Sequence, residues 1–143
     1  MGEALEAAKR YDEAYNAQDA QTRAATLTPD AEFVAPGGIN LRGPEQIAEL
    51  QKAFWEALPD GRVTHERHVE AGDQIVIEGH LTGTHTGTFR TPQGDIASTG
   101  NPVRLRYASI RRVQAGKIAS EHLYFDQLEF LTQIGAIPAP AAG

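Results

Sequence analysis

The sequence predicts an α+β fold in which N-terminal helices cover one face of a cone-shaped, curved, mixed or antiparallel β-sheet. Apolar residues recur every three or four positions up to Leu58, as in amphipathic helices, and alternate with polar residues beyond Gly61, as in half-buried strands. Helices followed by a run of hairpins are typical of α+β domains. A curved sheet covered by helices forms a cone whose open end can hold a mostly apolar pocket.

Three N-terminal helices are predicted. The first covers residues 3–18, where apolar side chains fall on one side. The second covers residues 21–27 and ends before Pro29, because the residue before a proline is disfavoured in a helix. The third begins at Gly43-Pro44-Glu45, with proline at the first helical position and an acidic residue in the first turn. A short strand at residues 31–35 separates the second helix from the third.

Long strands fill the second half of the chain. Glycine and proline residues interrupt the chain before the last two strands, which a tight turn at residues 114–117 connects. The predicted strands are residues 63–69, 74–82, 103–113 and 118–125. We expect residues 1–137 to form a single domain and residues 138–143 to be a frayed tail.

The composition argues against several classes of function. The chain has 143 residues, a formal net charge of -6 and a pI near 5.3, which disfavour a nucleic-acid or anionic-membrane partner. It has no cysteine, which excludes disulfides, thiolate nucleophiles and cysteine-based zinc sites. The N-terminal residues lack the basic and apolar regions of a signal peptide, and no apolar run could span a bilayer. We therefore expect a cytoplasmic protein.

The last strand concentrates titratable groups. With Ala-Gly at the centre of the turn, Ser109 lies opposite His122 and Tyr107 opposite Tyr124, so these four side chains share a face with Asp126. Partial burial at a pocket mouth would raise the pKa of this carboxylate, as a general base requires. We therefore predict Asp126 as the base, with His122 and Tyr124 beside it. A register slip of one residue would separate these groups.

The opposite face of this hairpin is apolar and carries Ala108, Ile110, Leu123 and Phe125. These residues are typical of packing or of a dimer interface, and they favour a homodimer. The pocket inside the cone is expected to hold a small ligand against aromatic and polar side chains. The predicted substrate-binding residues are Tyr11, Tyr15, Phe33, Phe54, Trp55, His80, Tyr107 and Ser109.

The candidate catalytic residues also have structural interpretations. Residues 126–129, Asp-Gln-Leu-Glu, match a capping box, in which Asp126 would accept hydrogen bonds from backbone N–H groups and stay ionised. His122 also fits a hydrogen-bonded residue of the pocket wall. Tyr107 and Tyr124 also fit packing aromatics whose hydroxyls reach water. The cap and the base are not exclusive if a single oxygen of Asp126 caps the helix.

The histidines raise the question of a metal site. His65 and His68 are expected on opposite faces of a strand, and no cysteine or close carboxylate completes a ligand set with His80 or His85. We therefore expect no metal site.

Four segments carry a family resemblance. They are Arg10-Tyr11 through Asn16-Ala17-Gln18-Asp19, Pro29-Asp30-Ala31-Glu32-Phe33, Gly83-Thr84-His85-Thr86-Gly87, and Tyr124-Phe125-Asp126-Gln127-Leu128 with Leu131-Thr132-Gln133-Ile134-Gly135. From about Ala8 to Ile137 the chain resembles the SnoaL-like polyketide cyclases of the nuclear transport factor 2-like superfamily. The first two segments are shared across that superfamily, and the last two are more specific to the cyclases. The resemblance implies a cystatin-like α+β barrel.

The resemblance also implies a reaction. In these cyclases an aspartate at the position of Asp126 acts as general acid and base. It would remove a C–H proton flanked by carbonyls, and the resulting enolate would attack another carbonyl of the same small, apolar molecule in an aldol ring closure. No cofactor is needed. Because cyclases can carry a polar partner such as histidine at the position of Tyr124, His122 or Tyr107 could be the second catalytic group.

Other members of the superfamily supply alternatives. Ketosteroid isomerases have a tyrosine donor at the position of Tyr11, but their base falls at Ala35 and their acidic donor near Ala108. Limonene-type epoxide hydrolases use an Arg-x-Asp pair, which Arg104-Leu105-Arg106 lacks. An isomerase or hydrolase is therefore a minor alternative. The main rival is a non-catalytic ligand-binding or dimeric scaffold module, because fold does not fix function.

Overall fold

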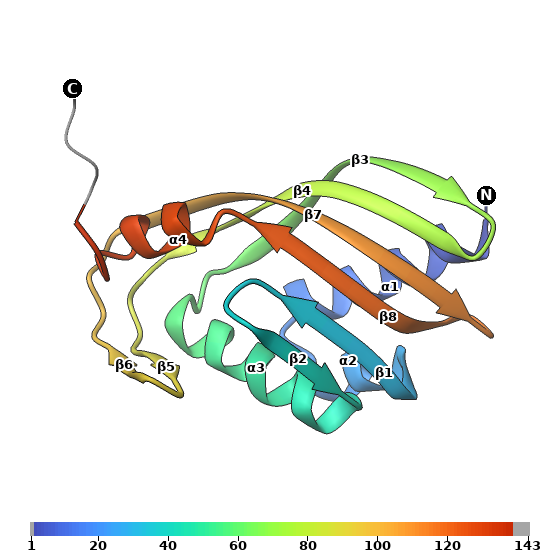
Figure 1. Cartoon of the computed structure of the whole chain (residues 1–143), viewed down its shortest axis with the longest axis horizontal. Coiled ribbons are helices and arrows are strands. Elements are labelled where there is room, and N and C mark those ends of the chain that lie inside the picture. The colour runs from blue at the N-terminus through green and yellow to red at the C-terminus, as the bar shows by residue number, and fades with distance from the viewer. Residues whose placement is uncertain (1, 139–143) are drawn as a thin grey trace.

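The computed structural model describes residues 2–138 and confirms the predicted α+β fold (Figure 1). The helices are α1 (Glu3–Asn16), α2 (Ala20–Ala25), α3 (Pro44–Ala57) and α4 (Gln127–Gln133). The strands are β1 (Leu27–Ala35), β2 (Ile39–Arg42), β3 (Arg62–Ala71), β4 (Gln74–Thr84), β5 (Phe89–Thr91), β6 (Gly94–Ile96), β7 (Pro102–Gln114) and β8 (Lys117–Phe125). Beyond Pro138, the tail that we expected to fray lies outside the described residues.

The main sheet has six strands in the order β2-β1-β8-β7-β4-β3. The pairing of β1 with β8 is parallel and the other pairings are antiparallel. The helix α1 packs across β3, β4, β7 and β8, while α3 packs against β1 and β2, so the two helices cover one face of the curved sheet (Figure 1). The sequence did not predict β2, β5 and β6, because three or four residues are too few to establish an alternating pattern.

Small residues let α1 lie close to the sheet. Ala4 and Ala8 are fully buried beneath it, and the larger Tyr11 and Tyr15 follow on the same side of the helix. The start of α3 depends on Gly43, whose φ of 88° lies in the region that favours glycine, followed by proline within the first turn. These two helices bring their aromatic side chains to the inner face of the sheet.

The hairpin of β7 and β8 follows the predicted register only near its turn. Val113 lies opposite Ile118 as predicted, but Arg112 lies opposite Ser120, so Ala119 is an extra residue on β8. This bulge shifts every later pair by one position. A shift of one residue exchanges the two faces of a strand, because successive side chains point to opposite sides.

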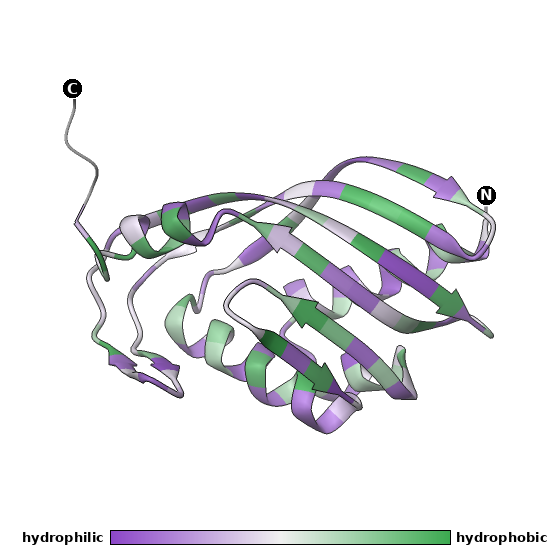
Figure 2. Cartoon of the chain, in the orientation of Figure 1, coloured by the Kyte–Doolittle hydropathy of each residue, from purple (hydrophilic) through white to green (hydrophobic). Residues whose placement is uncertain are grey.

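The predicted shared face is therefore wrong. Ser109 lies opposite Leu123 and Tyr107 opposite Phe125. These four side chains point into the cone, whereas His122, Tyr124 and Asp126 belong to the outer side. Ala108 and Ile110 lie on the outer side, opposite Tyr124 and His122, so the apolar face predicted for this hairpin is also wrong. Figure 2 shows the alternation of hydrophobic and hydrophilic residues along β7 that separates the two sides.

Within residues 2–138, no helix combines the length and the apolar character needed to cross a membrane.

Candidate active site

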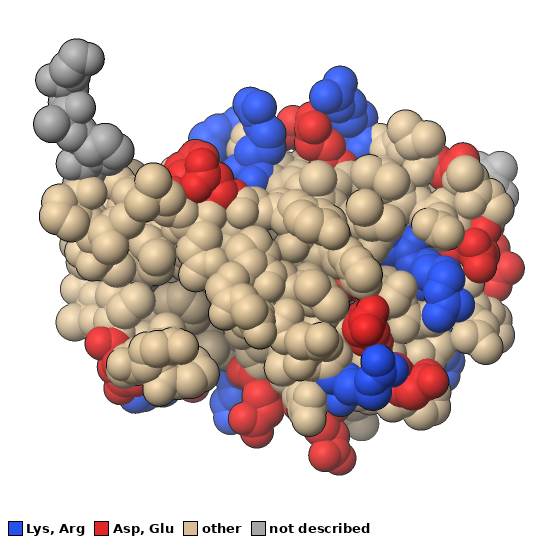
Figure 3. Space-filling view, in the orientation of Figure 1, with Lys and Arg blue, Asp and Glu red and all other residues tan. Residues whose placement is uncertain are grey.

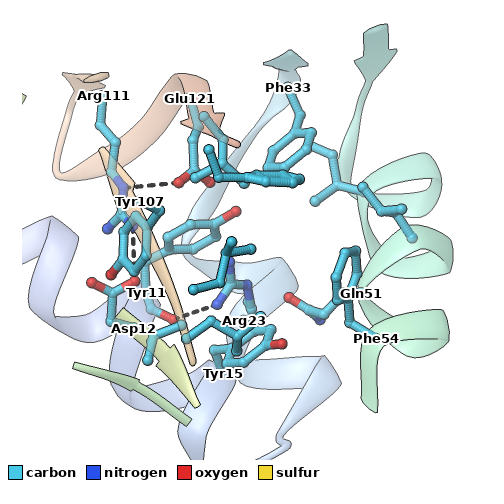
Figure 4. A pocket seen from close by; sticks show the side chains of 17 residues that line it. Tyr11, Asp12, Tyr15, Arg23, Phe33, Gln51, Phe54, Tyr107, Arg111 and Glu121 are labelled. Atoms are coloured by element: carbon cyan, nitrogen blue, oxygen red, sulfur yellow. Dashed lines mark hydrogen bonds and ion pairs between the residues drawn. The ribbon is translucent and has the colours of Figure 1, made fainter. Parts of the chain in front are cut away.

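A cavity lies inside the cone, between α1, α3 and the inner face of the sheet (Figure 4). Its volume is about 110 Å³ for a water-sized molecule. Most of its wall is apolar and comes from α3 and the strands, with Ile47, Leu50 and Phe54 on one side and Leu105 and Leu123 on the other. The cavity therefore favours a mostly apolar ligand.

A polar cluster, consisting of Asp12, Ser109, Arg111 and Glu121, closes one end of the cavity. Arg111 Nε donates to Glu121 Oε2 at 3.1 Å and to Ser109 Oγ at 3.0 Å, and Arg111 Nη2 donates to Asp12 Oδ1 at 2.9 Å. Ser109 Oγ donates to the same Glu121 oxygen at 2.6 Å. Because Arg111 and Glu121 are almost completely buried, these bonds hold both side chains in fixed positions (Figure 4).

A second guanidinium lines the cavity from α2. Arg23 lies 3.5 Å from the ring centroid of Tyr11 and 4.9 Å from that of Tyr15, and its Nη1 donates to the Tyr11 carbonyl at 3.1 Å. Its side chain forms no ion pair with any residue between 2 and 138. The stacking therefore brings a positive charge to an otherwise aromatic wall.

The cavity gathers polar atoms that have no hydrogen-bond partner within the protein. Eight buried side-chain atoms among the described residues lack a partner, and five of them belong to residues of the cavity wall. These five are Tyr11 Oη, Arg23 Nε, Gln51 Oε1, Tyr107 Oη and Glu121 Oε1. Buried polar atoms are usually satisfied, because an unpaired one costs about 1–3 kcal/mol. Their concentration at the cavity makes it the candidate site for a ligand that carries both donors and acceptors.

The ionisation states around the cavity follow from burial and charge. Burial acts to raise the pKa of Glu121, but Arg111 and Arg23 outweigh it, so the pKa lies below its usual value and the carboxylate is charged at neutral pH. Burial raises the pKa of Tyr11 and Tyr107, and raises that of Tyr15 to about 12. The three hydroxyls therefore keep their protons and can donate hydrogen bonds.

The predicted base lies outside this cavity. Asp126 is the N-cap of α4, where its Oδ1 accepts a hydrogen bond from the Glu129 backbone N–H at 3.0 Å, and its side chain is exposed. It lines an open outer groove together with Glu78, His80 and Tyr124. The predicted cap is therefore present, and the expectation that this carboxylate faces the cavity is wrong. The cause is the bulge in β8, which places it on the outer side.

The two predicted partners of Asp126 also face outwards. His122 Nε2 lies 2.9 Å from Glu32 Oε1 on the neighbouring strand, and Tyr124 is 53% exposed. Neither lines the cavity. The structure therefore does not bring the three predicted catalytic residues to the cavity, and their catalytic role stays a prediction.

The residues predicted to bind a substrate divide into two groups. Five line the cavity as predicted, namely Tyr11, Tyr15, Phe33, Phe54 and Tyr107. The other three do not. Trp55 packs against Tyr15 at a centroid distance of 5.6 Å, and Ser109 is buried behind Glu121 as its hydrogen-bond donor. His80 bonds Glu66 and lines the outer groove, because it occupies an outward position of β4.

One histidine pair differs from the prediction. His65 and His68 do not point to opposite faces, because a bulge between His65 and Arg67 lets His65 Nε2 lie 2.8 Å from His68 Nδ1. Among residues 2–138, no group of three or more His, Asp or Glu side chains could hold a metal ion.

The sequence patterns did not predict the polar residues of the cavity wall other than the tyrosines, namely Asp12, Arg23, Gln51, Arg111 and Glu121. One signal was available for Glu121. In β8 the apolar side chains of Leu123 and Phe125 identify the buried face, and Glu121 lies on that face two residues earlier. A charged residue on the apolar side of a strand requires a buried partner, and Arg111 supplies it from the neighbouring strand.

The geometry defines a cone-shaped α+β domain with a partly open, largely apolar cavity that has one polar end. The family model for SnoaL-like polyketide cyclases matches residues 5–134, and the chain belongs to this family. No curated protein matches the chain in a sequence comparison.

Solved structures share this fold. A SnoaL-like protein of Jannaschia sp. CCS1 is 24% identical, with a TM-score of 0.82 over 95% of this chain and 94% of that chain. IdmH of Streptomyces antibioticus, a candidate polyketide cyclase, is 23% identical, with a TM-score of 0.78 over 94% of this chain and 99% of that chain. TerC, co-crystallised with polyporic acid, is 21% identical, with a TM-score of 0.75 over 93% of this chain and 98% of that chain. At these identities the likeness shows a shared fold.

Proposed function

We propose that this protein is a cofactor-independent enzyme that binds a small, mostly apolar, carbonyl-rich molecule inside the cone and closes a ring in it by intramolecular aldol addition. Membership of the SnoaL-like family supports the reaction class. The observation that carries the proposal is the group of unpartnered polar atoms in an otherwise apolar cavity. Such a cavity would fold a flexible chain and hold its oxygens in fixed positions, which lowers the entropic part of the barrier.

Tyrosine hydroxyls would bind the reacting oxygens. Tyr11 and Tyr107 keep their protons; the buried Tyr107 hydroxyl has no hydrogen-bond partner among residues 2–138, and the Tyr11 hydroxyl lies beside the Glu121 carboxylate. They can donate to the oxygen on which negative charge develops when a proton leaves the neighbouring carbon. Because these donors are positioned before the reaction starts, they need no reorganisation as the charge forms.

The proposed activity can be tested with a panel of polyketide-type β-diketones and diketo esters. Ring closure by aldol addition yields a product with the mass of the substrate, whereas hydration adds one water, so chromatography coupled to mass spectrometry separates the two. Leu50→Trp would fill the cavity and abolish turnover, while Leu128→Trp, on the exposed side of α4, is the matched control. Equal turnover in both variants would place the reaction elsewhere.

A binding protein without catalysis is the second candidate. The exposed position of Asp126 favours it, because the carboxylate that the family resemblance assigns as the base does not line the cavity. Under this alternative, members of the panel would bind in the cavity and remain unchanged. Calorimetric binding without product formation would support it over the cyclase.

We further propose that the outer face of the sheet pairs with a second copy of the chain. Val76 and Ile110 lie opposite each other there and are partly exposed, as is Tyr124. Charges of both signs, such as Glu78 and Arg106, line the same face, so the surface is complementary to itself under twofold symmetry. Figure 3 shows uncharged residues in the middle of the face in view and charged residues towards its edges.

The oligomeric state tests this pairing. Ile110→Asp should convert a dimer into a monomer in sedimentation velocity, because it buries a charge at the centre of the interface. Lys52→Glu, at an exposed position of α3, should leave the dimer intact. A wild-type chain that sediments as a monomer at all accessible concentrations would exclude the pairing.

A further inference from the structure

We infer that Glu121, rather than Asp126, is the group that accepts the ligand's acidic proton. The inference rests on the proposed function and names the residue that would act in it. Glu121 lines the cavity and is 4% exposed, and its Oε1 accepts no hydrogen bond of good geometry from residues 2–138, although the Tyr11 hydroxyl lies close enough to lower the pKa of Glu121. A buried charged oxygen that faces a cavity is the strongest acceptor that this site offers to a ligand.

The protein fixes this carboxylate through its other oxygen. Glu121 Oε2 accepts from Ser109 Oγ at 2.6 Å and from Arg111 Nε at 3.1 Å. Arg111 is held in turn by Asp12 and by the carbonyl of Ala8. Because these contacts go to Oε2 or to the guanidinium, they orient the side chain, and a ligand at Oε1 would share the carboxylate with the neighbouring Tyr11 hydroxyl. Arrangements of this kind support reacting groups in preorganised sites.

The groups around Oε1 restrict what the ligand can present to it. The ionised carboxylate can only accept hydrogen bonds, whereas Arg23 Nε can only donate, and the hydroxyls of Tyr11 and Tyr107 can do either. A ligand satisfies all of them when an acidic hydrogen points at Glu121 and an adjacent oxygen points at the hydroxyls. A 1,3-dicarbonyl with its C–H between the two carbonyls, or its enol, has this arrangement.

In the proposed reaction one proton moves from the substrate carbon to Glu121 and returns to the product oxygen. The low pKa of Glu121 makes it a weak base, so its Oε1 can take the proton from the carbon between two carbonyls only because the Tyr11 and Tyr107 hydroxyls stabilise the enolate that the C–H electron pair forms. Tyr11 and Tyr107 donate hydrogen bonds to the enolate oxygen. The enolate carbon bonds to a second carbonyl carbon, and the resulting alkoxide takes the proton back from the Glu121 carboxylic acid. The product is a β-hydroxy ketone of unchanged mass, and no oxidant or reductant is needed.

A matched pair of ligands measures the acceptor directly. 4-Hydroxyacetophenone carries an acidic O–H that acetophenone lacks, while the two molecules share the ring and the ketone. We expect the wild-type protein to bind the hydroxylated compound about tenfold or more tightly in isothermal titration calorimetry, as a hydrogen bond to a charged group implies. Glu121→Gln should lose most of this preference. Asp126→Asn should keep it, because its side chain lies outside the cavity.

A measurement on the unmodified protein covers the case in which Glu121→Gln does not fold. In the complex of wild-type protein with 4-hydroxyacetophenone, the hydroxyl proton should give a low-field NMR signal with a nuclear Overhauser effect to the side-chain protons of Glu121. Contact of that proton with Asp126, or a Glu121→Gln variant that keeps the tenfold preference, would overturn the inference. A wild-type protein without the preference would also overturn it.

The inference and the proposed function fail in different ways. If the diketone panel gives no product while the hydroxyl preference depends on Glu121, the cyclase is wrong and Glu121 remains the cavity's acceptor. If products form and Asp126→Asn alone lowers turnover at least a hundredfold, the cyclase stands and the assignment of Glu121 is wrong. Turnover that survives Asp126→Asn and falls in Glu121→Gln supports both.

Discussion

The two sides of β8 carry carboxylates in opposite environments. On the inner side, Glu121 is 4% exposed, paired with Arg111 and adjacent to the cavity. On the outer side, Asp126 follows the same strand, faces solvent and caps a helix. These two residues are only five positions apart. One bulged residue, Ala119, can therefore decide which of two carboxylates faces the cavity.

Charge pairs also differ between the two sides. Inside, Arg111 holds Asp12 and Glu121 with hardly any exposure of its own side chain. Outside, Glu32 pairs with His122, whose side chain is 40% exposed. Exposed pairs contribute little because water and salt screen them, whereas the loss of one partner from a buried group leaves an uncompensated charge. The same interaction should therefore matter far more inside the cone than outside it.

The largest expected effect is on stability when the inner cation is removed. Arg111→Met should lower the free energy of unfolding by about 3–5 kcal/mol, because Asp12 and Glu121 lose their common partner. Arg62→Met, on the edge strand β3, is the control. Arg62 is exposed and forms no ion pair with a residue of the described range, so its change should stay within about 0.5 kcal/mol. Urea denaturation measures the free energy of unfolding of both variants. Equal losses of stability would contradict the expected difference between buried and exposed charges.

Acid should weaken the inner side more than the outer one. The pKa of Glu121 is below its usual value in the fold, so the unfolded chain binds more protons as the pH falls below about 4.3. The ionised Glu121 therefore stabilises the fold above that pH, and this stabilisation is lost as the pH falls through the lowered pKa of Glu121. Glu121→Gln should flatten this part of the stability profile.

Glu32→Gln provides the matched outer comparison. The hydrogen bond from His122 lowers the pKa of Glu32, so the direction of the effect is the same. Because that pair is exposed, the change in slope should be smaller. Denaturation at a series of pH values measures how the free energy of unfolding changes with pH in each variant. A larger change of this slope in Glu32→Gln than in Glu121→Gln would contradict the expected order.

A smaller effect is expected at the helix cap. Asp126→Ala should cost about 1 kcal/mol, and Asp126→Asn only a few tenths, because asparagine caps as well as aspartate. Turnover adds the test that stability cannot give. If Asp126 is the base, as the family resemblance predicts, Asp126→Asn should lower turnover by roughly a hundredfold or more while the fold stays intact. Unchanged turnover would mean that Asp126 caps α4 and is not the base.

The fold could be predicted from the sequence because it depends on patterns that extend over many residues. The spacing in α1 and α3 and the alternation in β4 and β7 are long enough to identify each element. Aromatic residues on the buried side of these helices, such as Tyr11 and Phe54, were therefore correctly expected to line the cavity.

The polar end of the site could not be predicted in the same way, because it depends on a single residue. The spacing of Glu121 from Leu123 and Phe125 puts the three on one face of β8, but the insertion of Ala119, which makes this face meet Tyr107 and Ser109 of β7, leaves no mark in the sequence. Arg23 was missed for a different reason. It lies on a helix of six residues and reaches the cavity by stacking on α1, a contact between elements that no local pattern reveals.

The last prediction separates stability from ligand binding on the inner side. Tyr107 Oη is buried and has no hydrogen-bond partner in the part of the chain that the structure describes, so Tyr107→Phe removes an unsatisfied group and should raise the free energy of unfolding by up to about 1 kcal/mol. The same change should weaken binding of acetophenone, because its ketone loses a donor. Tyr124→Phe is the outer control and should alter neither quantity, since that hydroxyl is exposed. Lower stability with unchanged ketone binding would mean that the Tyr107 hydroxyl supports the fold instead of the ligand.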